Sequence, residues 1–330
     1  MTQKKVCRKD LWVKYGMPVE CMVTMPTCPP SPASPQALMR LLARFRRQRP
    51  LRAGSLLITV FGDSIAPHGG AVSLASLIRL AAPFGVSERL VRTSVGRLAM
   101  DGRLTCRRVG RQSEYALAEE GAAVFAAAAE RIYAIAPPRW DGAWTMIVFA
   151  RWPGASRDRL RHELRFAGFG EPVAGLFLHP FASLAQAAML VQKLDPEGCA
   201  TLLRTEPGVA PSGAGLTGHG WDLGGLDRRY REFIRRFGPL ASIGGLGPPH
   251  AFQLRTLLIH EYRRIHLLDP DLPADLLPKA WAGTEARSLC SAIYRQVFDA
   301  AEAHLASDAE RVDGALPHAS REVRRRFGGL

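Results

Sequence analysis

Cysteine is scarce in this chain: there are six among 330 residues, and no two of them form a CxxC pair. This scarcity argues against a disulfide scaffold and against a structural zinc site. The chain also lacks an apolar run of the roughly 18 residues that span a bilayer, and its start lacks the apolar stretch of a signal peptide. No GxSxG motif is present, and the Gly-rich stretches at 215–220 and 244–247 match neither a GxGxxG loop after a strand nor a Walker A loop, which argues against several common enzyme and nucleotide-binding classes. We therefore expect a cytoplasmic protein without a membrane partner.

Basic charge, by contrast, is abundant. Lys and Arg total 44 against 30 acidic residues, and the resulting net charge of +14 suggests a polyanionic partner. Residues 1–50 hold ten of these basic residues and two acids, and they include a stretch rich in Pro and Ser. We expect residues 1–50 to be a disordered basic leader, although 37–50 could form a short helix or arm. Met25 and Met39 are alternative starts, so residues 1–36 need not belong to the native protein.

Residues 51–120 show a more ordered pattern. Apolar residues recur at helical spacing after residue 54, a second helix follows Ser73, and a third begins at Ser87; serine is a typical N-cap residue. Two short strands with a polar tip, within 103–118, then form a basic hairpin. Three helices followed by a hairpin describe a winged helix, in which the third helix enters the major groove of DNA.

The third helix of this module carries a basic face beside its apolar stripe. Arginine can hold guanine with two hydrogen bonds, and serine or threonine can contact base edges or phosphate. Two other interpretations fit the same stripe: a helical subdomain with merely solvated arginines, and a winged helix that contacts only protein. The helix face and the hairpin tip together give the candidate DNA-binding residues Ser87, Arg89, Arg92, Thr93, Arg97, Arg108, Arg111 and Gln112.

The rest of the chain divides into a mixed segment and a helical one. An Ala-rich helix at 121–138 is expected to link the winged helix to the mixed segment, or to lie in a dimer interface. Strands and helices alternate over 139–212, with 172–180 taken as one strand, and they indicate a ferredoxin-like α+β unit. Residues 221–305 are helical, and we expect the polar tail at 306–330 to be loose.

Several blocks of the sequence resemble the PaaX family of transcriptional repressors of phenylacetic-acid degradation operons. The blocks together cover roughly residues 51–300, and they include GRQSEYALAEEG, RIYAIAPPRWDGAWTMIV and LRTLLIHEYRRIHLLDPDLPADLLPKAWAG. The resemblance implies a winged-helix reader, a central domain similar to the Cas2 fold and a helical C-terminal domain. It also implies a homodimer whose inducer is phenylacetyl-CoA.

Segment 255–264 holds the densest group of ionisable side chains in the C-terminal half. His260 and His266 are six residues apart, so they lie on different faces of a helix and do not form the HExxH pair of a zinc protease. An acyl-CoA would need basic donors for its phosphates and an apolar, aromatic-lined cavity for an aromatic acyl group. The candidate effector-binding residues are therefore Arg255, His260, Arg263, Arg264 and Trp281, and no metal or cofactor is expected.

A purely structural role for the same arginines is the alternative. Arg255 and Arg264 could pair with an acid in the Pro-rich connection after this helix, at Asp269, Asp271 or Asp275, and fix the helix against it.

The sequence thus predicts an α+β multidomain protein that represses an aromatic, phenylacetate-type catabolic operon. A homodimer would bind double-stranded operator DNA, and an aryl acyl-CoA, by preference phenylacetyl-CoA, would release it. An enzyme acting on an acyl-CoA thioester and a Cas2-like nuclease are the alternatives, but the first strand of the central unit ends in Ala-Arg-Trp rather than in carboxylates. The predicted segments are a leader (1–50), a winged helix (51–120), a linker helix (121–138), a ferredoxin-like, Cas2-like domain (139–212), a helical C-terminal effector domain (221–305) and a tail (306–330).

Overall fold

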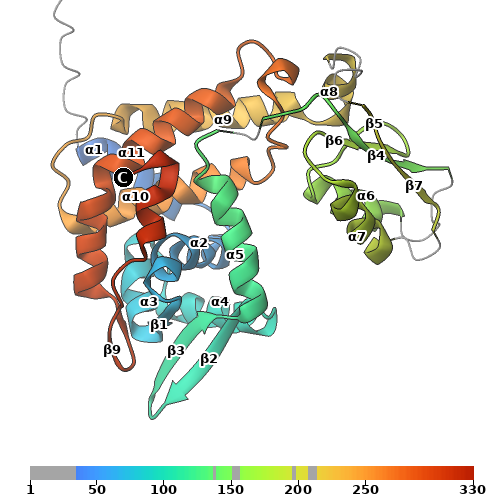
Figure 1. The fold of residues 1–330 in the computed structure, drawn as a ribbon. Helices are drawn as coiled ribbons and strands as arrows, with labels where there is room; N and C mark the ends of the chain where they lie inside the picture. Colours follow the sequence, from blue (N-terminus) through green and yellow to red (C-terminus); the bar gives the residue numbers. More distant parts are fainter. Residues whose placement is uncertain (1–34, 137–138, 151–156, 195–197, 207–213) are drawn as a thin grey trace, which may run out of the picture. The chain divides into compact units, whose positions relative to one another are not determined.

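The protein is described by a computed structural model that covers residues 35–136, 139–150, 157–194, 198–206 and 214–330 (Figure 1). Of these residues, none lies in a helix that combines the length and the apolar character needed to cross a membrane.

The first described helix, α1 (Pro35–Arg46), is part of the core. Its apolar residues Leu38, Leu42 and Phe45 are all buried, and the Phe45 ring meets the Phe84 ring edge-on with centroids 6.1 Å apart. The prediction of a disordered leader is therefore wrong for residues 35–46, because apolar side chains at helical spacing bury one face of a helix whose other face is basic. The rest of the predicted leader up to residue 34 lies outside the described residues.

Three helices and a small sheet make up the N-terminal module. They are α2 (Ala53–Val60), continued by a π-helical turn η2 (Phe61–Ile65) and by η3 (Ala66–His68), then β1 (Ala71–Ser73), α3 (Leu74–Ala81), η4 (Ala82–Phe84), α4 (Glu88–Met100), β2 (Leu104–Val109) and β3 (Gln112–Leu117). The side chains of Ser73 and Ser87 accept hydrogen bonds from the backbone N–H of Ser76 and Leu90, so both expected N-caps are present.

The strands of this module form an antiparallel sheet in the order β1-β3-β2. Val109 pairs with Gln112, so the turn consists of Gly110 and Arg111, and Gly110 has a positive φ of 60° that a tight hairpin turn requires. The hairpin β2–β3 was expected from the sequence, whereas the three-residue strand β1 was too short to leave a pattern.

Helix α5 (Glu119–Ile132) joins the base of this hairpin to the middle of the chain (Figure 1). The middle consists of β4 (Thr145–Phe149), α6 (Arg157–Phe166), β5 (Gly170–Val173), β6 (Leu176–His179), α7 (Leu184–Leu194) and β7 (Ala200–Arg204). Its four strands are antiparallel in the order β5-β6-β4-β7, which is the βαββαβ topology of a ferredoxin-like unit. The stretch 172–180 is not the single strand we expected, because Gly175 with φ 87° turns the chain between β5 and β6.

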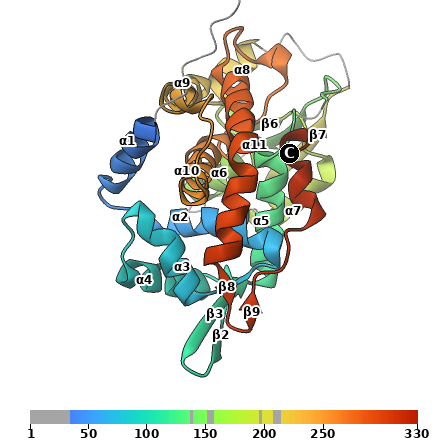
Figure 2. The ribbon, with the colours of Figure 1, turned by 90° about the vertical axis from the view of Figure 1, so that its left-hand side faces the viewer.

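The C-terminal half is built on two long helices that pack against each other, α10 (Pro248–His266) and α11 (Ala282–Asp308) (Figure 2). Helix α9 (Leu223–Phe237) packs on both and buries Tyr230, Phe233 and Phe237. The shorter elements are α8 (Ala214–Gly220), η5 (Gly238–Leu240) and η6 (Ala274–Leu276).

The C-terminal tail is ordered rather than loose. It forms a second hairpin from β8 (Glu310–Arg311) and β9 (Gly314–Ala315), followed by η7 (Arg321–Gly328). Val323, Arg326 and Phe327 are buried, and the backbone N–H of Phe327 donates to the carbonyl of Tyr133 at 2.9 Å. The expectation of a loose tail is wrong, because Val323, Phe327 and Arg326 are buried and anchor a segment that is otherwise polar.

Candidate nucleic-acid interface and ligand basin

Helix α4 presents its basic face to solvent. The side chains of Ser87, Arg89, Arg92, Thr93 and Arg97 are all exposed. Three of these side chains already have partners on the helix. The Ser87 hydroxyl accepts from the Leu90 N–H, Arg92 donates to the Glu88 carboxylate at 2.8 and 2.9 Å, and the Thr93 hydroxyl donates to the carbonyl of Arg89 at 2.9 Å. Within the described part of the chain, the guanidinium groups of Arg89 and Arg97 have no hydrogen bond or ion pair.

The hairpin β2–β3 extends this basic surface. Arg108, Arg111 and Gln112 at and near its tip are exposed, and none of the three side chains is hydrogen-bonded to another described residue. Arg107 differs, since it donates to the Glu114 carboxylate at 2.8 Å. All eight predicted DNA-binding residues thus lie at the surface, on two elements that adjoin in the same module.

A contact between the hairpin β2–β3 and the C-terminal hairpin was not visible in the sequence. The Glu114 side chain is buried, and it accepts hydrogen bonds from Arg107, from the backbone N–H of Val312 at 3.1 Å and from Arg311 at 3.4 Å. On α3, the Ser76 hydroxyl accepts from the backbone N–H of Glu310 at 3.0 Å. The C-terminal hairpin therefore holds β3 and α3 together, through contacts that span 198 and 234 residues of sequence.

A buried ionic cluster joins the N-terminal module to the C-terminal half. The guanidinium of Arg255 is fully buried and lies 3.1 Å from the Asp63 carboxylate and 2.6 Å from that of Glu302. Arg326 from the tail donates to Asp63 at 3.0 Å, and the hydroxyls of Tyr133 and Tyr294 donate to the same carboxylate oxygen. We call Asp63, Arg255, Glu302 and Arg326 the Asp63 cluster.

Charge in the Asp63 cluster is well compensated. Burial alone would lower the pKa of Arg255, but the two acids beside it raise that pKa above its ordinary value. Burial likewise opposes ionisation of Glu302, whereas His68 and Arg255 lower its pKa to about 2. Arg255 and Glu302 thus stay ionised. The expectation that Arg255 contacts an effector is wrong, because its side chain is fully buried and its nitrogen atoms face Asp63, Glu302 and Ser64.

Two further candidate effector residues have contacts within the protein. His260 is buried, its Nδ1 lies 3.0 Å from the Thr59 hydroxyl, and burial together with Arg263 and Arg264 lowers its pKa to about 3. Trp281 is half-buried, and its ring packs edge-on against Tyr230 with centroids 5.7 Å apart. The expectation that His260 holds a ligand is therefore wrong, because its side chain is fully buried, whereas a ligand contact of Trp281 stays a prediction.

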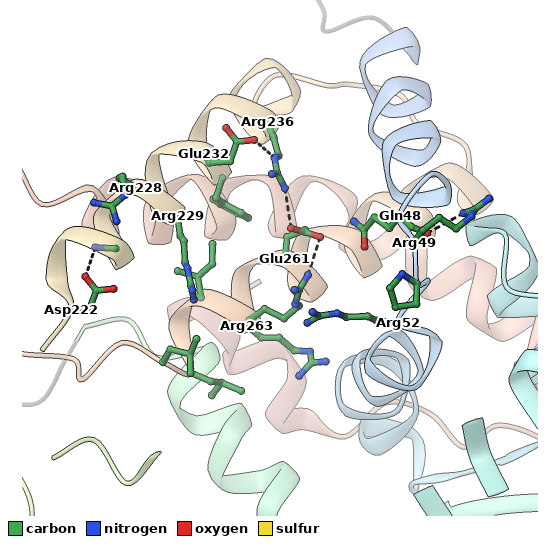
Figure 3. A pocket seen from close by; sticks show the side chains of 17 residues that line it. Gln48, Arg49, Arg52, Asp222, Arg228, Arg229, Glu232, Arg236, Glu261 and Arg263 are labelled. Atoms are coloured by element: carbon green, nitrogen blue, oxygen red, sulfur yellow. Dashed lines mark hydrogen bonds and ion pairs between the residues drawn. The ribbon is translucent and has the colours of Figure 1, made fainter. Parts of the chain in front are cut away.

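Arg263 and Arg264, the remaining candidates, line a basin of about 1060 Å³ between the α1–α2 connection, α9 and α10 (Figure 3). Its charge is dominated by arginine, with three acids against seven basic side chains. The arginines are Arg49, Arg52, Arg228, Arg229, Arg236, Arg263 and Arg264, and the acids are Asp222, Glu232 and Glu261. Sequence reasoning missed Arg228 and Arg229, although the run LDRRYREFIRRF offered the signal: basic residues on the exposed side of a strongly amphipathic helix.

The acids of the basin leave much of its positive charge uncompensated. Arg236 pairs with Glu232 and Glu261 at 2.6 and 3.1 Å, and Arg264 lies 3.7 Å from Glu261. Arg52, Arg228 and Arg229 are exposed and have no hydrogen-bond or ion-pair partner among the described residues (Figure 3). The structural alternative that paired Arg255 and Arg264 with acids of the Pro-rich connection is wrong for both residues.

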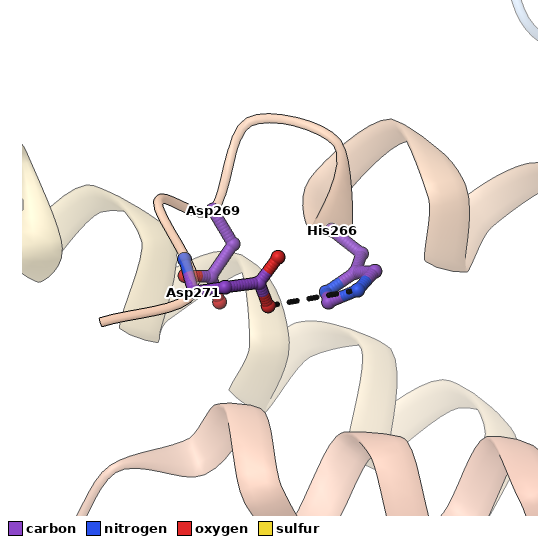
Figure 4. A group of neighbouring side chains, drawn as sticks. All are labelled: His266, Asp269 and Asp271. Atoms are coloured by element: carbon purple, nitrogen blue, oxygen red, sulfur yellow. Dashed lines mark hydrogen bonds and ion pairs between the residues drawn. The ribbon is translucent and has the colours of Figure 1, made fainter. Parts of the chain in front are cut away.

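Two of those acids, Asp269 and Asp271, take part in a different cluster at the end of α10 (Figure 4). The ligand-capable atoms of His266, Asp269 and Asp271 lie within 4.8 Å of one another. Each is already engaged: the His266 Nε2 donates to the carbonyl of Arg131 at 2.9 Å, Tyr230 donates to Asp269 at 2.8 Å, and Asp271 pairs with two arginines. Burial raises the pKa of Asp269 to about 6 and lowers that of His266 to about 4. This chemistry ties α10 to α5, α9 and α11 rather than favouring a cation.

Three family models and one curated relative match this chain, and all four point to the same family. Family models match at residues 52–121 (PaaX-like protein), 137–215 (PaaX protein central Cas2-like domain) and 221–307 (PaaX-like protein C-terminal domain). The transcriptional repressor PaaX of Escherichia coli (strain K12) is 34% identical over 289 residues, which cover 85% of this chain and 92% of the relative. Among solved structures, the uncharacterized protein Rv0674 from Mycobacterium tuberculosis is similar with a TM-score of 0.45 and 24% identity, covering 68% of this chain and 89% of that chain.

These matches confirm the expected Cas2-like character of the central domain. They also favour the predicted repressor over an acyl-CoA enzyme or a nuclease, because the curated relative is a regulator. The chain belongs to the PaaX family and is a transcriptional repressor rather than an enzyme.

Proposed function

We propose that this repressor acts on a phenylacetate-type catabolic operon and reads its operator through the N-terminal module, used as a winged helix. The observation that carries the proposal is the solvent-exposed row of arginines on α4, continued by Arg108 and Arg111 at the tip of the hairpin β2–β3. Four of these guanidinium groups have no partner in the described part of the chain, so DNA binding displaces no protein contact at those positions.

The two elements suit different parts of DNA. A helix of the length of α4 fits the major groove, where an arginine held against guanine O6 and N7 discriminates by about 1–3 kcal/mol per base pair. Arginines at a hairpin tip suit phosphates or the minor groove, where they add affinity with little sequence information. The C-terminal hairpin contacts Glu114 on β3 and Ser76 on α3, and so ties the hairpin β2–β3 to the helical part of the module.

The working form in this proposal is a cytoplasmic homodimer on a two-fold related operator. A dimer places two copies of α4 in successive major grooves on one face of the duplex, so half-site centres about 34–36 Å apart are expected. Support for the dimer comes from the sequence resemblance to the family. Sedimentation of the protein with and without operator DNA tests it.

The effector in this proposal is an aryl acyl-CoA, with phenylacetyl-CoA as the first choice. Such a molecule carries a pyrophosphate and a ribose phosphate, and the arginine basin offers donors for such groups. Release of the operator requires that the effector bind the DNA-competent and the released conformations unequally.

A mobility shift on the DNA upstream of the protein's own gene tests this function. We expect a specific complex that phenylacetyl-CoA dissolves, whereas CoA and phenylacetate alone leave it in place. A complex that no aryl acyl-CoA affects would contradict the effector, and the absence of any specific complex on that DNA or on a phenylacetate operon promoter would contradict the operator.

A further inference from the structure

A small apolar cavity lies directly beside the arginine basin. It has a volume of about 40 Å³ and is enclosed by α2 with η2, by α5 and by α10. Its walls are mostly apolar and include Ile58, Phe125, Ala128, Ile132 and Ile259. Two residues of α10, Arg263 and Leu267, line both the cavity and the basin, so the two spaces adjoin at these side chains.

Arg263 stands at this boundary and holds the N-terminal module to the C-terminal half. Its guanidinium donates to the Ser55 carbonyl at 2.6 Å, to the Ser55 hydroxyl at 2.9 Å and to the Thr59 hydroxyl at 2.8 Å, all on α2. Burial and the neighbouring Arg264 lower the pKa of Arg263 to about 10. A phosphate in the basin would relieve this crowding of positive charge and compete with α2 for the guanidinium.

The positive charge of the basin comes from three separate elements. Arg52 precedes the first residue of α2, Arg228 and Arg229 lie on α9, and Arg264 lies on α10. The guanidinium groups of the first three have no partner among the described residues. Arg52 and Arg229 point into the space that the basin encloses, and Arg228 lies at its edge (Figure 3). A ligand with two or more phosphates therefore finds hydrogen-bond donors on several sides of the basin. A single phosphate would contact only some of these donors.

The cavity is too small for an aromatic ring as it stands. Apolar cavities that hold benzene measure about 150 Å³, so a phenyl group could enter only if α5 moved away from α2 and α10. The Phe125 ring of α5 lies against Gly62, where a Cβ would come within 2.9 Å of it. Phe125 is half-buried at the cavity wall, so it is the side chain that an entering ring must displace.

Movement of α5 would reach the DNA-binding face directly. Helix α5 starts right after β3, and its Gly121 lies so close to the Arg103 carbonyl that a Cβ there would be 2.5 Å from the oxygen. The backbone N–H of Ala118 also donates to this carbonyl, at 3.1 Å. Arg103 leads into β2, so α5 and the base of the hairpin β2–β3 move as one piece.

We propose that the arginine basin binds the phosphates of the acyl-CoA effector, and that its acyl group enters the apolar cavity between α2, α5 and α10 and displaces the hairpin through α5. The proposal rests on the proposed function for the identity of the ligand. The aryl group, and not the CoA portion, then carries the signal, because only the aryl group requires α5 to move.

Titration calorimetry with CoA and with phenylacetyl-CoA tests the two halves of the site separately. The double variant Arg228→Gln/Arg229→Gln is expected to weaken binding of both ligands at least tenfold. Ala128→Leu, which fills the cavity, is expected to weaken binding of phenylacetyl-CoA at least tenfold and binding of CoA less than threefold. Lys279→Gln removes an exposed positive charge outside the basin and is the matched control, with both affinities expected within twofold of wild type. Thermal unfolding checks each variant, and Ala129→Val replaces Ala128→Leu if the latter does not fold.

The outcomes separate this proposal from the function it rests on. If wild type binds phenylacetyl-CoA and releases the operator but the double variant binds it equally well, the basin is not the phosphate site. Unchanged phenylacetyl-CoA affinity in the cavity variant overturns the acyl half. If wild type does not bind phenylacetyl-CoA at all, the proposed effector fails, and inorganic pyrophosphate titrated into wild type and double variant decides on the basin alone. A double variant that loses operator affinity without any ligand assigns the basin to DNA phosphates and overturns the proposal.

Discussion

Two groups of arginines in this protein look alike in sequence and differ completely in surroundings. Those on α4 and at the hairpin tip stand in water, and the ion pair of Arg92 with Glu88 leaves both side chains more than half exposed. Arg255 and Arg326 are enclosed with Asp63 and Glu302, and the Arg326 guanidinium also lies 4.0 Å from the centre of the Tyr133 ring. One group is available to a partner, and the other holds two halves of the chain together.

The difference teaches that basic density alone does not mark a binding site. Exposed ion pairs contribute about 0–1 kcal/mol to stability, because water and salt screen them. Breaking a buried pair by removing one partner costs about 3–5 kcal/mol, because the other charge is left uncompensated in the core. Substitutions in the two groups should therefore affect different measurements.

The largest expected effect is on folding, in Arg255→Ala. The substitution leaves Asp63 and Glu302 without their shared cation, so we expect the free energy of unfolding to fall by about 3–5 kcal/mol. Urea denaturation followed by far-UV circular dichroism measures it. A decrease in the free energy of unfolding below about 1 kcal/mol would mean that water reaches the Asp63 cluster. The two groups of arginines would then not differ in their contribution to stability.

Arg92→Ala should affect DNA binding and hardly affect folding. We expect operator binding to weaken by about 1–3 kcal/mol with relaxed sequence preference, and stability to change by less than about 1 kcal/mol. Fluorescence anisotropy on operator and mutated operator DNA measures both. Arg231→Ala is the matched control, because Arg231 makes the same i,i+4 pair, with Asp227 on α9, at 2.7 Å; equal losses in the two variants would remove α4 as the reader.

The buried histidine beside the basin predicts a dependence of stability on pH. The pKa of His260 is lowered to about 3 by burial, by Arg263 and Arg264 on α10 and by Arg52 before α2. In the unfolded chain the same ring takes up a proton below about pH 6.5, so its contribution is complete above pH 6.5 and is lost as the pH falls toward 3. Asp269, whose raised pKa is about 6, acts in the opposite direction.

Wild type should therefore lose about 1–2 kcal/mol of stability between pH 7 and pH 5 through His260. Thermal unfolding at a series of pH values, compared with His260→Gln, isolates this contribution. The same pH dependence in both proteins would show that His260 is accessible to protons in the folded state.

The smallest expected effect is a change in the salt dependence of operator binding, which distinguishes Arg108 from its neighbour Arg107 on β2. Arg108 has no partner in the described part of the chain, whereas Arg107 pairs with the buried Glu114. Arg108→Ala should reduce the slope of log K against log salt for operator binding by about 1, as expected for one lost phosphate contact. Arg107→Ala should leave the slope unchanged, even if it lowers affinity by loosening the hairpin. A reduced slope in Arg107→Ala would make it a phosphate contact.

Local features of the fold could be predicted from the sequence, because each depends on residues close in the chain. The N-caps at Ser73 and Ser87, the apolar stripe of α4 and the hairpin with Gly110 at its turn all belong to this class. The alternation of strands and helices was likewise enough for the central unit, and only the tight turn at Gly175 was overlooked.

Contacts between distant segments could not be predicted. Arg326 lies 263 residues from Asp63 and Arg311 lies 197 residues from Glu114, and no periodicity records such a pairing. The same holds for the candidate ligand site. Segment 255–264 stands out in the sequence for its ionisable side chains, but along one helix Arg255 and His260 face the core while Arg263 and Arg264 line the basin.

The position of Arg326 has a consequence for how the protein is made. A ribosome completes the N-terminal module first, and domains generally begin to fold as they emerge. Asp63, however, receives its second cation only when residue 326, nineteen residues beyond the end of the last family match at 307, has left the ribosome. A message cut short between these two points would yield a chain with every matched domain present and a buried carboxylate only half neutralised. We therefore expect such a chain to be less stable than one that carries Arg326.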